Sequence, residues 1–371
     1  MNISILSDSI DTQYAGIHIY TKHLILGLAK SQYVSNLYTI RSINGPKMAP
    51  NEDKIIIENK KIPLYRYLRA FYIVPRFIKK INPDIVIEPA HFGPFNLPKT
   101  IKRVTVIHDL TPILNSSWHP LASVVAHRLL LKRILRKADL IITNSAHSKS
   151  DIVSYYPQCK QKIKAVHLGV SSSLVKVDSK QPLQKLGINK SYILYLGTIE
   201  PRKNLSRVIE AYNHMRRKHP ERTEQLLIAG KEGWKTRDIM NTRRHSPYVD
   251  DIILLGYVDR EDIPCLLSHT SLFVYPSLYE GFGLPVLEAL ACGARVLTSN
   301  TSSLPEVGGE HCDYCDPYDI GDIATKMSQA LISQDTEEEQ KARITYAQGY
   351  TWERFGETFS EYLQELHQSD R

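Results

Sequence analysis

The sequence predicts an α/β protein built from two doubly wound parallel sheets, each in its own domain. Short apolar runs alternate with longer stretches of helical periodicity, which is typical of parallel strands covered by helices on both faces. This alternation starts anew near residue 192, and 371 residues are more than one hydrophobic core usually supports. Two domains of somewhat under 200 residues each are therefore expected.

The first domain is placed at 1–175. A buried strand is expected over 2–8, and a helix over 17–30, where apolar residues recur at helical spacing. The later strands of this domain alternate with helical stretches near 65–80 and 120–137, and we place these strands at 84–88, 103–107 and 139–143.

The second domain is placed at 176–350, after a connection in the polar stretch 171–190. A strand over 192–197 opens it and a helix over 203–218 follows. Four further strands are expected, at 225–229, 251–255, 271–275 and 294–298. The remaining residues, 351–371, are predicted to form a C-terminal helix that packs back on the first domain. Ligands of doubly wound sheets bind beyond the carboxyl ends of the strands, so a site is expected in a cleft between the two domains.

Several classes of protein are disfavoured by what the sequence lacks. No run approaches the roughly 18 apolar residues that cross a bilayer, and the start has no basic region of a secretory signal, so we expect a cytoplasmic protein. Neither GxGxxG nor GxxxxGK[ST] occurs, which disfavours ordinary dinucleotide and P-loop sites. Cys312 and Cys315 form a CxxC without a second pair, and we expect buried structural thiols rather than a zinc or redox site.

The two halves of the chain differ in charge. Residues 1–175 hold 24 Lys and Arg against 10 Asp and Glu, whereas residues 176–371 hold 23 against 29. This asymmetry is expected if the first domain alone faces an anionic surface.

The segment 275–289 carries the most informative pattern. A strand ends there, a loop with two glycines follows, and Pro285 suits the first turn of a helix, whose free N–H groups form an anion site. Glu280 lies in the loop and Glu288 on the helix, where their carboxylates can accept hydrogen bonds from sugar hydroxyls. The alternative is a surface glutamate beside an ordinary capping loop.

A second pattern follows the strand that ends at Gly197. Arg202 and Lys203 stand together at the start of a helix, where the helix dipole already places positive charge. A bound diphosphate would resolve this conflict, because the arginine offers a bidentate fork and the lysine a mobile charge. The alternative is two solvated surface charges.

The first domain offers two weaker candidates. His108 follows the strand at 103–107, so its ring is expected near the carboxyl edge of the sheet, where it can bind a sugar hydroxyl. A purely structural histidine is the alternative. Gly16, after the first strand, would allow close approach of the backbone to a phosphate or sugar.

These segments together resemble glycosyltransferase family 4 over nearly the whole chain, most closely the bacterial mannosyltransferases of O-antigen and capsule assembly. The resemblance implies a GT-B fold, which has two Rossmann-like domains facing across a cleft. It also implies a nucleotide-sugar donor held mainly by the second domain, an acceptor on the first, retention of anomeric configuration, and no metal or other cofactor. The segments that carry it are 197–205, 280–288, His108 to Pro112, Thr143 to Ser145 and Asn300 to Gly309.

The resemblance also implies residue roles. Glu280 would contact the donor sugar, Glu288 the ribose, Arg202 and Lys203 the diphosphate, and His108 the sugar beside the reaction centre. Two departures concern phosphate contacts, since Thr198 stands where many members have Arg, and Ala15 precedes Gly16 where many have a second glycine. The expected catalytic residues are His108, Glu280, Arg202 and Lys203, and the expected donor-binding residues are Gly16, Arg202, Lys203, Gly281, Phe282, Gly283, Leu284 and Glu288.

The predicted function is retaining transfer of mannose from GDP-mannose to a lipid-linked or oligosaccharide acceptor in cell-surface polysaccharide biosynthesis. The alternatives are another donor linked to UDP or dTDP, another GT-B enzyme such as an epimerase or phosphorylase, or an inactive binding subunit. We expect no nucleic-acid partner.

Two basic stretches, 65–80 and 127–137, predict peripheral binding to the inner face of the cytoplasmic membrane. The alternative is two ordinary helices with solvated charges, and Pro75 is expected to interrupt the first of them.

Overall fold

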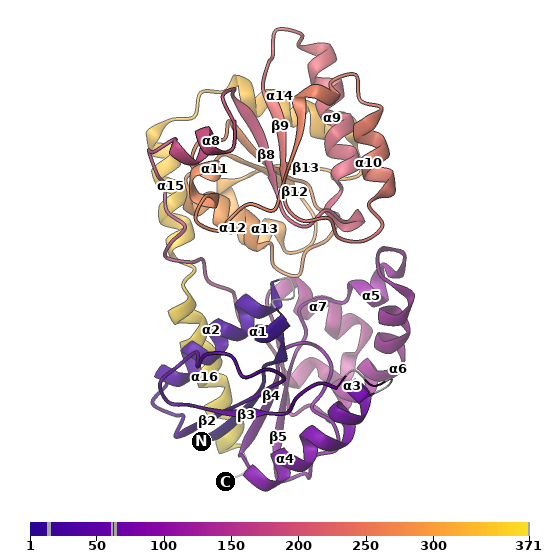
Figure 1. Ribbon diagram of the computed structural model, residues 1–371, viewed down its shortest axis with the longest axis vertical. Coiled ribbons are helices and arrows are strands. Elements are labelled where there is room, and N and C mark those ends of the chain that lie inside the picture. Colours follow the sequence, from indigo (N-terminus) through magenta and orange to yellow (C-terminus); the bar gives the residue numbers. More distant parts are fainter. Residues whose placement is uncertain (13–15, 61, 63–64, 370–371) are drawn as a thin grey trace. The chain divides into compact units, whose positions relative to one another are not determined.

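The computed structural model describes residues 1–12, 16–60, 62 and 65–369. The chain divides into two compact units (Figure 1). Unit 1 comprises Met1–Gly169 together with Thr351–Arg371, and unit 2 comprises Val170–Tyr350. The division after Gly169 lies six residues before the boundary expected at 175.

Unit 1 contains a seven-stranded parallel sheet in the order β3-β2-β1-β4-β5-β6-β7. The reversal of direction beside β1 is the mark of a doubly wound sheet, and it confirms the predicted fold class. The strands are β1 (Asn2–Leu6), β2 (Asn36–Arg41), β3 (Glu52–Ile56), β4 (Ile85–Glu88), β5 (Lys102–Val106), β6 (Leu140–Thr143) and β7 (Ile163–Ala165).

Three strands of this sheet, β2, β3 and β7, were not expected from the sequence. β2 begins with the exposed Asn36, and β3 begins with Glu52, Asp53 and Lys54, so no continuous apolar run marks either of them. β7 is only three residues long. β3 and β7 are the edges of the sheet and lack the full burial that makes central strands largely apolar, whereas β2 lies between β3 and β1 and was missed because polar residues break its apolar run.

The longer helices of unit 1 cover the sheet, and α16 packs along α2 (Figure 1). Gly27 and Gly356 meet where these two helices cross, since a Cβ on Gly27 would lie 2.7 Å from the Cα of Gly356. The helices are α1 (Asp8–Thr12), α2 (Ile17–Lys30), α3 (Tyr65–Leu68), α4 (Val74–Ile81), α5 (Thr111–Leu114), α6 (Leu121–Lys137), α7 (Ala146–Tyr155) and α16 (Trp352–Gln368), with 3-10 turns η2 (Ser116–Trp118) and η3 (Pro157–Lys162).

Pro75 was expected to interrupt the helical path, but the path continues through it. A π-helical turn, η1 (Arg69–Ile73), links α3 to α4, and Pro75 lies in the first turn of α4. A wider turn immediately before a proline relieves the clash of its ring with the preceding carbonyl.

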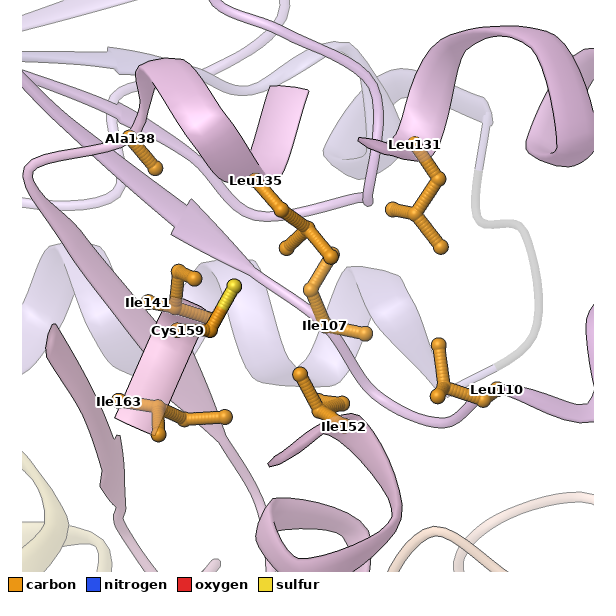
Figure 2. Close-up of a cluster of buried hydrophobic side chains, with 9 residues drawn as sticks. All are labelled: Ile107, Leu110, Leu131, Leu135, Ala138, Ile141, Ile152, Cys159 and Ile163. Atoms are coloured by element: carbon orange, nitrogen blue, oxygen red, sulfur yellow. The ribbon is translucent and has the colours of Figure 1, made fainter. Parts of the chain in front are cut away.

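A compact apolar cluster fixes α6 and α7 to the sheet of unit 1 (Figure 2). Leu131 and Leu135 of α6 pack with Ile141 of β6 and Ile152 of α7, and all four side chains are fully buried. This packing leaves the opposite side of α6 facing solvent.

Unit 2 contains a six-stranded parallel sheet in the order β10-β9-β8-β11-β12-β13, again doubly wound. The strands are β8 (Tyr192–Leu196), β9 (Gln225–Ala229), β10 (Ile252–Gly256), β11 (Leu272–Tyr275), β12 (Val296–Ser299) and β13 (Asp313–Cys315). The helices are α8 (Gln181–Lys185), α9 (Leu205–Lys218), α10 (Arg237–Arg244), α11 (Ile263–Ser268), α12 (Leu284–Ala291), α13 (Leu304–Gly308), α14 (Ile320–Ile332) and α15 (Glu337–Gln348), with 3-10 turns η4 (Pro201–Lys203), η5 (Val249–Asp251) and η6 (Gly309–His311).

The charge asymmetry is smaller between these units than between the two halves of the sequence. The segment 351–371 brings five acidic residues into unit 1, which then holds 26 Lys and Arg against 15 Asp and Glu. Unit 2 holds 21 against 24. Unit 1 therefore stays the basic part of the molecule.

The cysteines are all free, and burial raises the pKa of Cys315 to about 12. Within the described residues, no three histidine, cysteine or acidic side chains form a group that could hold a metal ion. The helices of the described part are all too short or too polar to span a bilayer.

Candidate active site

One group of candidate residues lies at the carboxyl ends of β8 and β11, which are neighbours in the sheet of unit 2. The segments that follow these strands are tied together by backbone and side-chain hydrogen bonds. The backbone N–H of Leu278 donates to the carbonyl of Arg202 (2.9 Å), and Asn204 Nδ2 donates to the carbonyl of Pro276 (3.0 Å). Two motifs separated by more than 70 residues in the sequence thus form one structure.

Glu280 is the centre of this structure. Lys203 Nζ donates to Glu280 Oε1 at 2.6 Å, and Arg202 Nη1 donates to Glu280 Oε2 at 2.9 Å. Arg202 also pairs with Glu200 through Nη2 and Oε1 at 2.8 Å. The hydroxyl of Ser277 donates to Glu280 Oε1 at 2.6 Å. We call Glu200, Arg202, Lys203 and Glu280 the ion cluster.

The ion cluster is withdrawn from solvent. Glu280 is 6% exposed, Lys203 is 8% exposed and the side chain of Arg202 is 18% exposed, so Lys203 is not the solvated surface charge of the alternative and Arg202 is mostly covered. Burial alone would raise the pKa of Glu280, but the charges of Arg202 and Lys203 lower it to about 2. Burial lowers the pKa of Lys203, and the charge of Glu280 opposes that effect. Glu280 is therefore a carboxylate at neutral pH.

The loop after Glu280 is held in a fixed conformation. Ser303 Oγ donates to the carbonyls of Glu280 (2.9 Å) and Phe282 (2.8 Å). Gly281 and Phe282 are buried, and Gly283 has a φ of 104°, a left-handed conformation that favours glycine. Gly283 precedes Leu284, the first residue of α12, and no side chain caps this helix. Pro285 has no N–H and the N–H of Val286 donates to the carbonyl of Gly283 (3.0 Å), so the N–H of Leu284 is the group of this first turn that can meet an anion.

Glu288 lies on α12 and is not brought into the ion cluster. Among the described residues, no hydrogen bond or ion pair joins its carboxylate to another side chain. Burial raises the pKa of Glu288 to about 7, and the charge of Arg260 opposes this shift. The Glu288 carboxyl group is therefore present in both protonation states near neutral pH.

A separate group of candidate residues lies at the carboxyl edge of the unit 1 sheet. His108 follows β5, and burial lowers its pKa, so the ring is neutral. Nε2 donates to the carbonyl of Pro89 (2.8 Å), which leaves Nδ1 to accept from Asn144 Nδ2 (2.9 Å). Both ring nitrogens of His108 are thus engaged by the protein. Its contact with a sugar hydroxyl stays a prediction.

Sequence reasoning missed the residues that hold His108. The backbone N–H of His108 donates to His91 Nε2 (2.9 Å), His91 Nδ1 lies 3.2 Å from His127 Nε2, and His127 Nδ1 donates to the carbonyl of Ser123 (2.8 Å). His91 has a φ of 72°, a conformation uncommon outside glycine that functional sites often retain. Glu88, at the end of β4, was also missed. A charged residue that ends an apolar strand was the available signal.

Gly16 precedes α2 with a φ of −69°, and a Cβ there would meet nothing within 4 Å. The fold itself therefore does not require glycine at this position. The adjoining Tyr14 and Ala15 lie outside the described residues, and a ligand contact of Gly16 stays a prediction.

Known proteins match the sequence of this chain over both units. Residues 14–174 match the model of Glycosyltransferase Family 4, and residues 178–349 match that of Glycosyl transferases group 1. The chain is 35% identical to O-antigen chain mannosyltransferase B of Escherichia coli, over 95% of this chain and 97% of that protein. It is 28% identical to the serotype-specific mannosyltransferase WbdA of the same species, over 91% of this chain but only 45% of that longer protein.

Solved structures share the fold across the whole chain. Sucrose-phosphate synthase from Thermosynechococcus elongatus matches with a TM-score of 0.76 at 19% identity, covering 98% of both chains. WaaG, a glycosyltransferase involved in lipopolysaccharide biosynthesis, matches with a TM-score of 0.73 at 15% identity, covering 97% of this chain and 99% of WaaG. With two family models that together span nearly all of the sequence, the chain belongs to glycosyltransferase family 4 and is a glycosyltransferase with the GT-B fold.

Proposed function

We propose that this enzyme transfers mannose from GDP-mannose, with retention, to a growing cell-surface polysaccharide. The observation that carries the chemistry is the buried ion cluster beside the uncapped start of α12. The choice of mannose is supported by the relative named as an O-antigen chain mannosyltransferase, which is 35% identical over 95% of this chain.

The ion cluster suits a leaving diphosphate. Glu200 and Glu280 together balance the charges of Arg202 and Lys203, and Glu280 contacts both cations and holds them in place. A donor diphosphate brings negative charge to the same cations, and this charge grows as the bond between the sugar and phosphate breaks. Fixed cations and the helix start stabilise that growing charge without reorganisation. The Glu280 carboxylate is then free to accept a hydrogen bond from a hydroxyl of the donor sugar.

Retention follows if the acceptor attacks on the face that the diphosphate leaves. The acceptor oxygen bonds to the anomeric carbon, the bonding pair departs with the phosphate oxygen, and that oxygen takes the proton of the acceptor hydroxyl. This route needs no protein base. It is compatible with Glu280 of unit 2, which is held as an ion pair, and with His108 of unit 1, which is engaged through both ring nitrogens. Because Arg202 and Lys203 supply the positive charge, we expect no metal requirement.

The ribose of the donor is assigned to Glu288. A carboxylate accepts hydrogen bonds from two neighbouring hydroxyls, and Glu288 makes no such bond with the described residues. Donation by the ribose hydroxyls would favour the ionised form of Glu288 and lower its pKa from about 7.

The donor is tested by thermal shift and by transfer of labelled sugar. A ligand present at a hundred times its dissociation constant stabilises a protein by about 2.7 kcal/mol. GDP should therefore raise the melting temperature more than UDP, dTDP or ADP, and EDTA should leave transfer unchanged. Greater stabilisation by UDP would contradict the choice of donor. Strict dependence on manganese would contradict the metal-free mechanism, and binding without transfer from any donor would identify an inactive subunit.

We also propose that the acceptor is lipid-linked and that unit 1 binds an anionic membrane surface through α6. Leu121 and Leu129 are 78% and 72% exposed, and Val125 lies between them at the four-residue spacing of one helix face. Five exposed cations follow on this helix, which contains no acidic residue; they are Arg128, Lys132, Arg133, Arg136 and Lys137. An exposed apolar stripe with flanking cations is typical of helices that lie in a membrane interface.

The basic stretch 65–80 contributes less than expected. Arg69 is buried, donates to the carbonyl of Ile57 (2.8 Å) and pairs with Asp8 (2.9 Å), so this residue is structural. The side chain of Arg66 lies outside the described part of the structure. Exposed residues remain further along, namely Tyr72, Arg76, Phe77, Lys79 and Lys80.

Liposome sedimentation tests the surface. Replacing Leu121, Val125 and Leu129 with glutamine should reduce binding to anionic vesicles. Neutralising the five cations of α6 should make the binding that remains insensitive to salt. The matched control neutralises Arg217 and Lys218, two exposed cations of α9 in unit 2. Equal binding of wild type to neutral and anionic vesicles would exclude this surface.

A further inference from the structure

Glu88 is a buried carboxyl group that the mechanism above does not use. It ends β4, the strand between β1 and β5, and is 8% exposed. The carboxyl ends of these central strands form the edge of unit 1 at which a doubly wound sheet binds its ligand. His108 follows β5 at the same edge.

Only half of the Glu88 carboxyl group is engaged by the protein. Oε1 accepts the N–H of Ala90 at 2.8 Å. Oε2 has no hydrogen-bond partner among the described residues, although the residue is more than nine-tenths buried. A Cβ on residue 93 would lie 3.3 Å from Oε2, so the glycine found there keeps this oxygen uncrowded.

Among the described residues, no cation forms an ion pair with Glu88. The guanidinium of Arg69, whose charge acts on Glu88, donates to Asp8 and to the carbonyl of Ile57. Burial therefore dominates and raises the pKa of Glu88 to about 8, the Ala90 N–H and Arg69 oppose the shift, and Asp8 adds to it. At neutral pH the carboxyl group is mostly protonated, and its O–H is a hydrogen-bond donor.

The segment that carries Glu88 is fixed to the His108 loop. Pro89, the next residue, accepts from His108 Nε2, and His91 accepts the backbone N–H of His108 while donating its own backbone N–H to the carbonyl of Val106 (3.1 Å). Glu88 is thus held rigidly beside the residue that family resemblance places at the reaction centre. Rigid placement of this kind makes a polar group effective in binding.

We propose that Glu88 binds the acceptor sugar by donating a hydrogen bond from its carboxyl group to a sugar hydroxyl. This inference rests on the proposed function, in which unit 1 holds the acceptor. A neutral carboxyl group both donates and accepts, which matches a hydroxyl, and it carries no charge that would attract a cation or repel a phosphate. A buried polar group of this type discriminates strongly against ligands that lack the matching hydroxyl.

Two substitutions of Glu88 test the proposal with α-mannobiose as the acceptor probe. Glu88→Gln keeps one donor and one acceptor in the same shape, and it should keep kcat/KM for the acceptor within about threefold. Glu88→Met keeps the volume but has neither the hydrogen-bond donor nor the acceptor, and it should lower kcat/KM for the acceptor at least tenfold. The stabilisation by GDP should not change in either variant, because the ion cluster is in unit 2.

The matched control is Glu52, another buried glutamate of the same sheet. Its carboxylate accepts from Thr39 Oγ1 (2.5 Å) and from the backbone N–H of Ala49 (3.3 Å), so both oxygens serve the fold. Glu52→Met should lower the melting temperature without changing the KM for the acceptor. The same result for Glu88→Met would make Glu88 structural and overturn the proposal.

The pH profile supplies a second readout. Ionisation of Glu88 as the pH rises through about 8 removes the donated hydrogen bond, so the KM for the acceptor should rise there in the wild type and stay flat in Glu88→Gln. The charged group of α1 that faces Glu88 is Asp8, that of η1 is Arg69, and these two side chains pair with each other. An alkaline limb that persists unchanged in Glu88→Gln would contradict the assignment.

Direct binding of α-mannobiose, measured by calorimetry with GDP present, separates this inference from the proposed function. Binding that is lost in Glu88→Met but kept in Glu88→Gln supports the inference even if no donor is transferred. Equal binding by wild type and Glu88→Met, or none by the wild type, overturns it whatever the activity.

Discussion

Replacing Glu280 with glutamine should lower the unfolding free energy measured without GDP and should increase the stabilisation that GDP provides. The substitution keeps the shape of the side chain but leaves Lys203 buried without a carboxylate partner, while Arg202 keeps Glu200. The fall in the pKa of Glu280 from 4.5 to about 2 corresponds to roughly 3 kcal/mol at neutral pH. Removing one member of a buried ion pair costs about 3–5 kcal/mol, which is the same order. We therefore expect unit 2 to lose about 3 kcal/mol of unfolding free energy.

A diphosphate would replace the missing negative charge. If Arg202 and Lys203 bind the donor diphosphate, GDP no longer competes with the Glu280 carboxylate in the variant. Saturating GDP should then raise the unfolding free energy of Glu280→Gln by more than it raises that of the wild type. Transfer should still fall at least tenfold, because the hydrogen bond from the donor sugar to the carboxylate is lost.

Urea unfolding with and without GDP measures both effects at constant ionic strength. Ser277→Ala is the matched control, because it removes a 2.6 Å hydrogen bond to Glu280 but leaves every charge of the ion cluster in place. Ser277→Ala should have a lower unfolding free energy than the wild type, but GDP should not stabilise it more than it stabilises the wild type. Equal or smaller stabilisation of Glu280→Gln by GDP would refute the placement of the diphosphate on these cations.

The pH dependence of the same variant follows from linkage. The pKa of Glu280 is depressed in the folded state, so its contribution is fully present above pH 4.5 and is lost as the pH falls towards about 2. Unfolding free energy in this acid range should therefore decline less steeply in Glu280→Gln than in the wild type.

Four further substitutions test the ion cluster, the contact between α2 and α16, and the core of unit 1. Arg202→Ala and Lys203→Ala should each lower transfer at least tenfold in radiolabel assays, since loss of one preorganised partner of a developing charge costs about 3 kcal/mol; unchanged rates would exclude a catalytic role. Gly27→Ala places a methyl group 2.7 Å from the Cα of Gly356 and should destabilise the packing of α16 on α2 by about 1–3 kcal/mol, seen as faster proteolysis of the C-terminal helix. Leu131→Ala empties part of the cluster in Figure 2 and should cost about 2–5 kcal/mol in urea unfolding, whereas a loss below 1 kcal/mol would mean that this core collapses around the cavity.

Local sequence was sufficient for the central strands and for the motif segments. β4, β5, β6, β8, β9 and β11 lie within about one residue of their expected positions, because strands buried on both faces must be apolar throughout. The edge strand β3 escaped prediction since a half-exposed strand tolerates charged residues such as Asp53 and Lys54, and its neighbour β2 escaped because polar residues interrupt its apolar run.

The pairing of the motifs was decided by the tertiary structure. The sequence marked Glu280 as a sugar ligand and Arg202 and Lys203 as phosphate ligands, but only the adjacency of β8 and β11 brings them into one buried ion cluster. Strand order depends on contacts between distant segments, which no local pattern records.

Burial decided the roles of individual polar residues in the same way. Arg69 belongs to a basic stretch, yet the fold buries it against Asp8 and so removes it from the predicted membrane surface. The sequence named His108 but gave no sign that both its ring nitrogens are engaged, nor that Glu88 stands buried and half-paired nearby. Residue type and spacing determined which chemistry this chain carries. Desolvation and hydrogen-bond partners, which exist only once the chain has folded, decided which groups are charged, which are neutral and which stay free to meet a substrate.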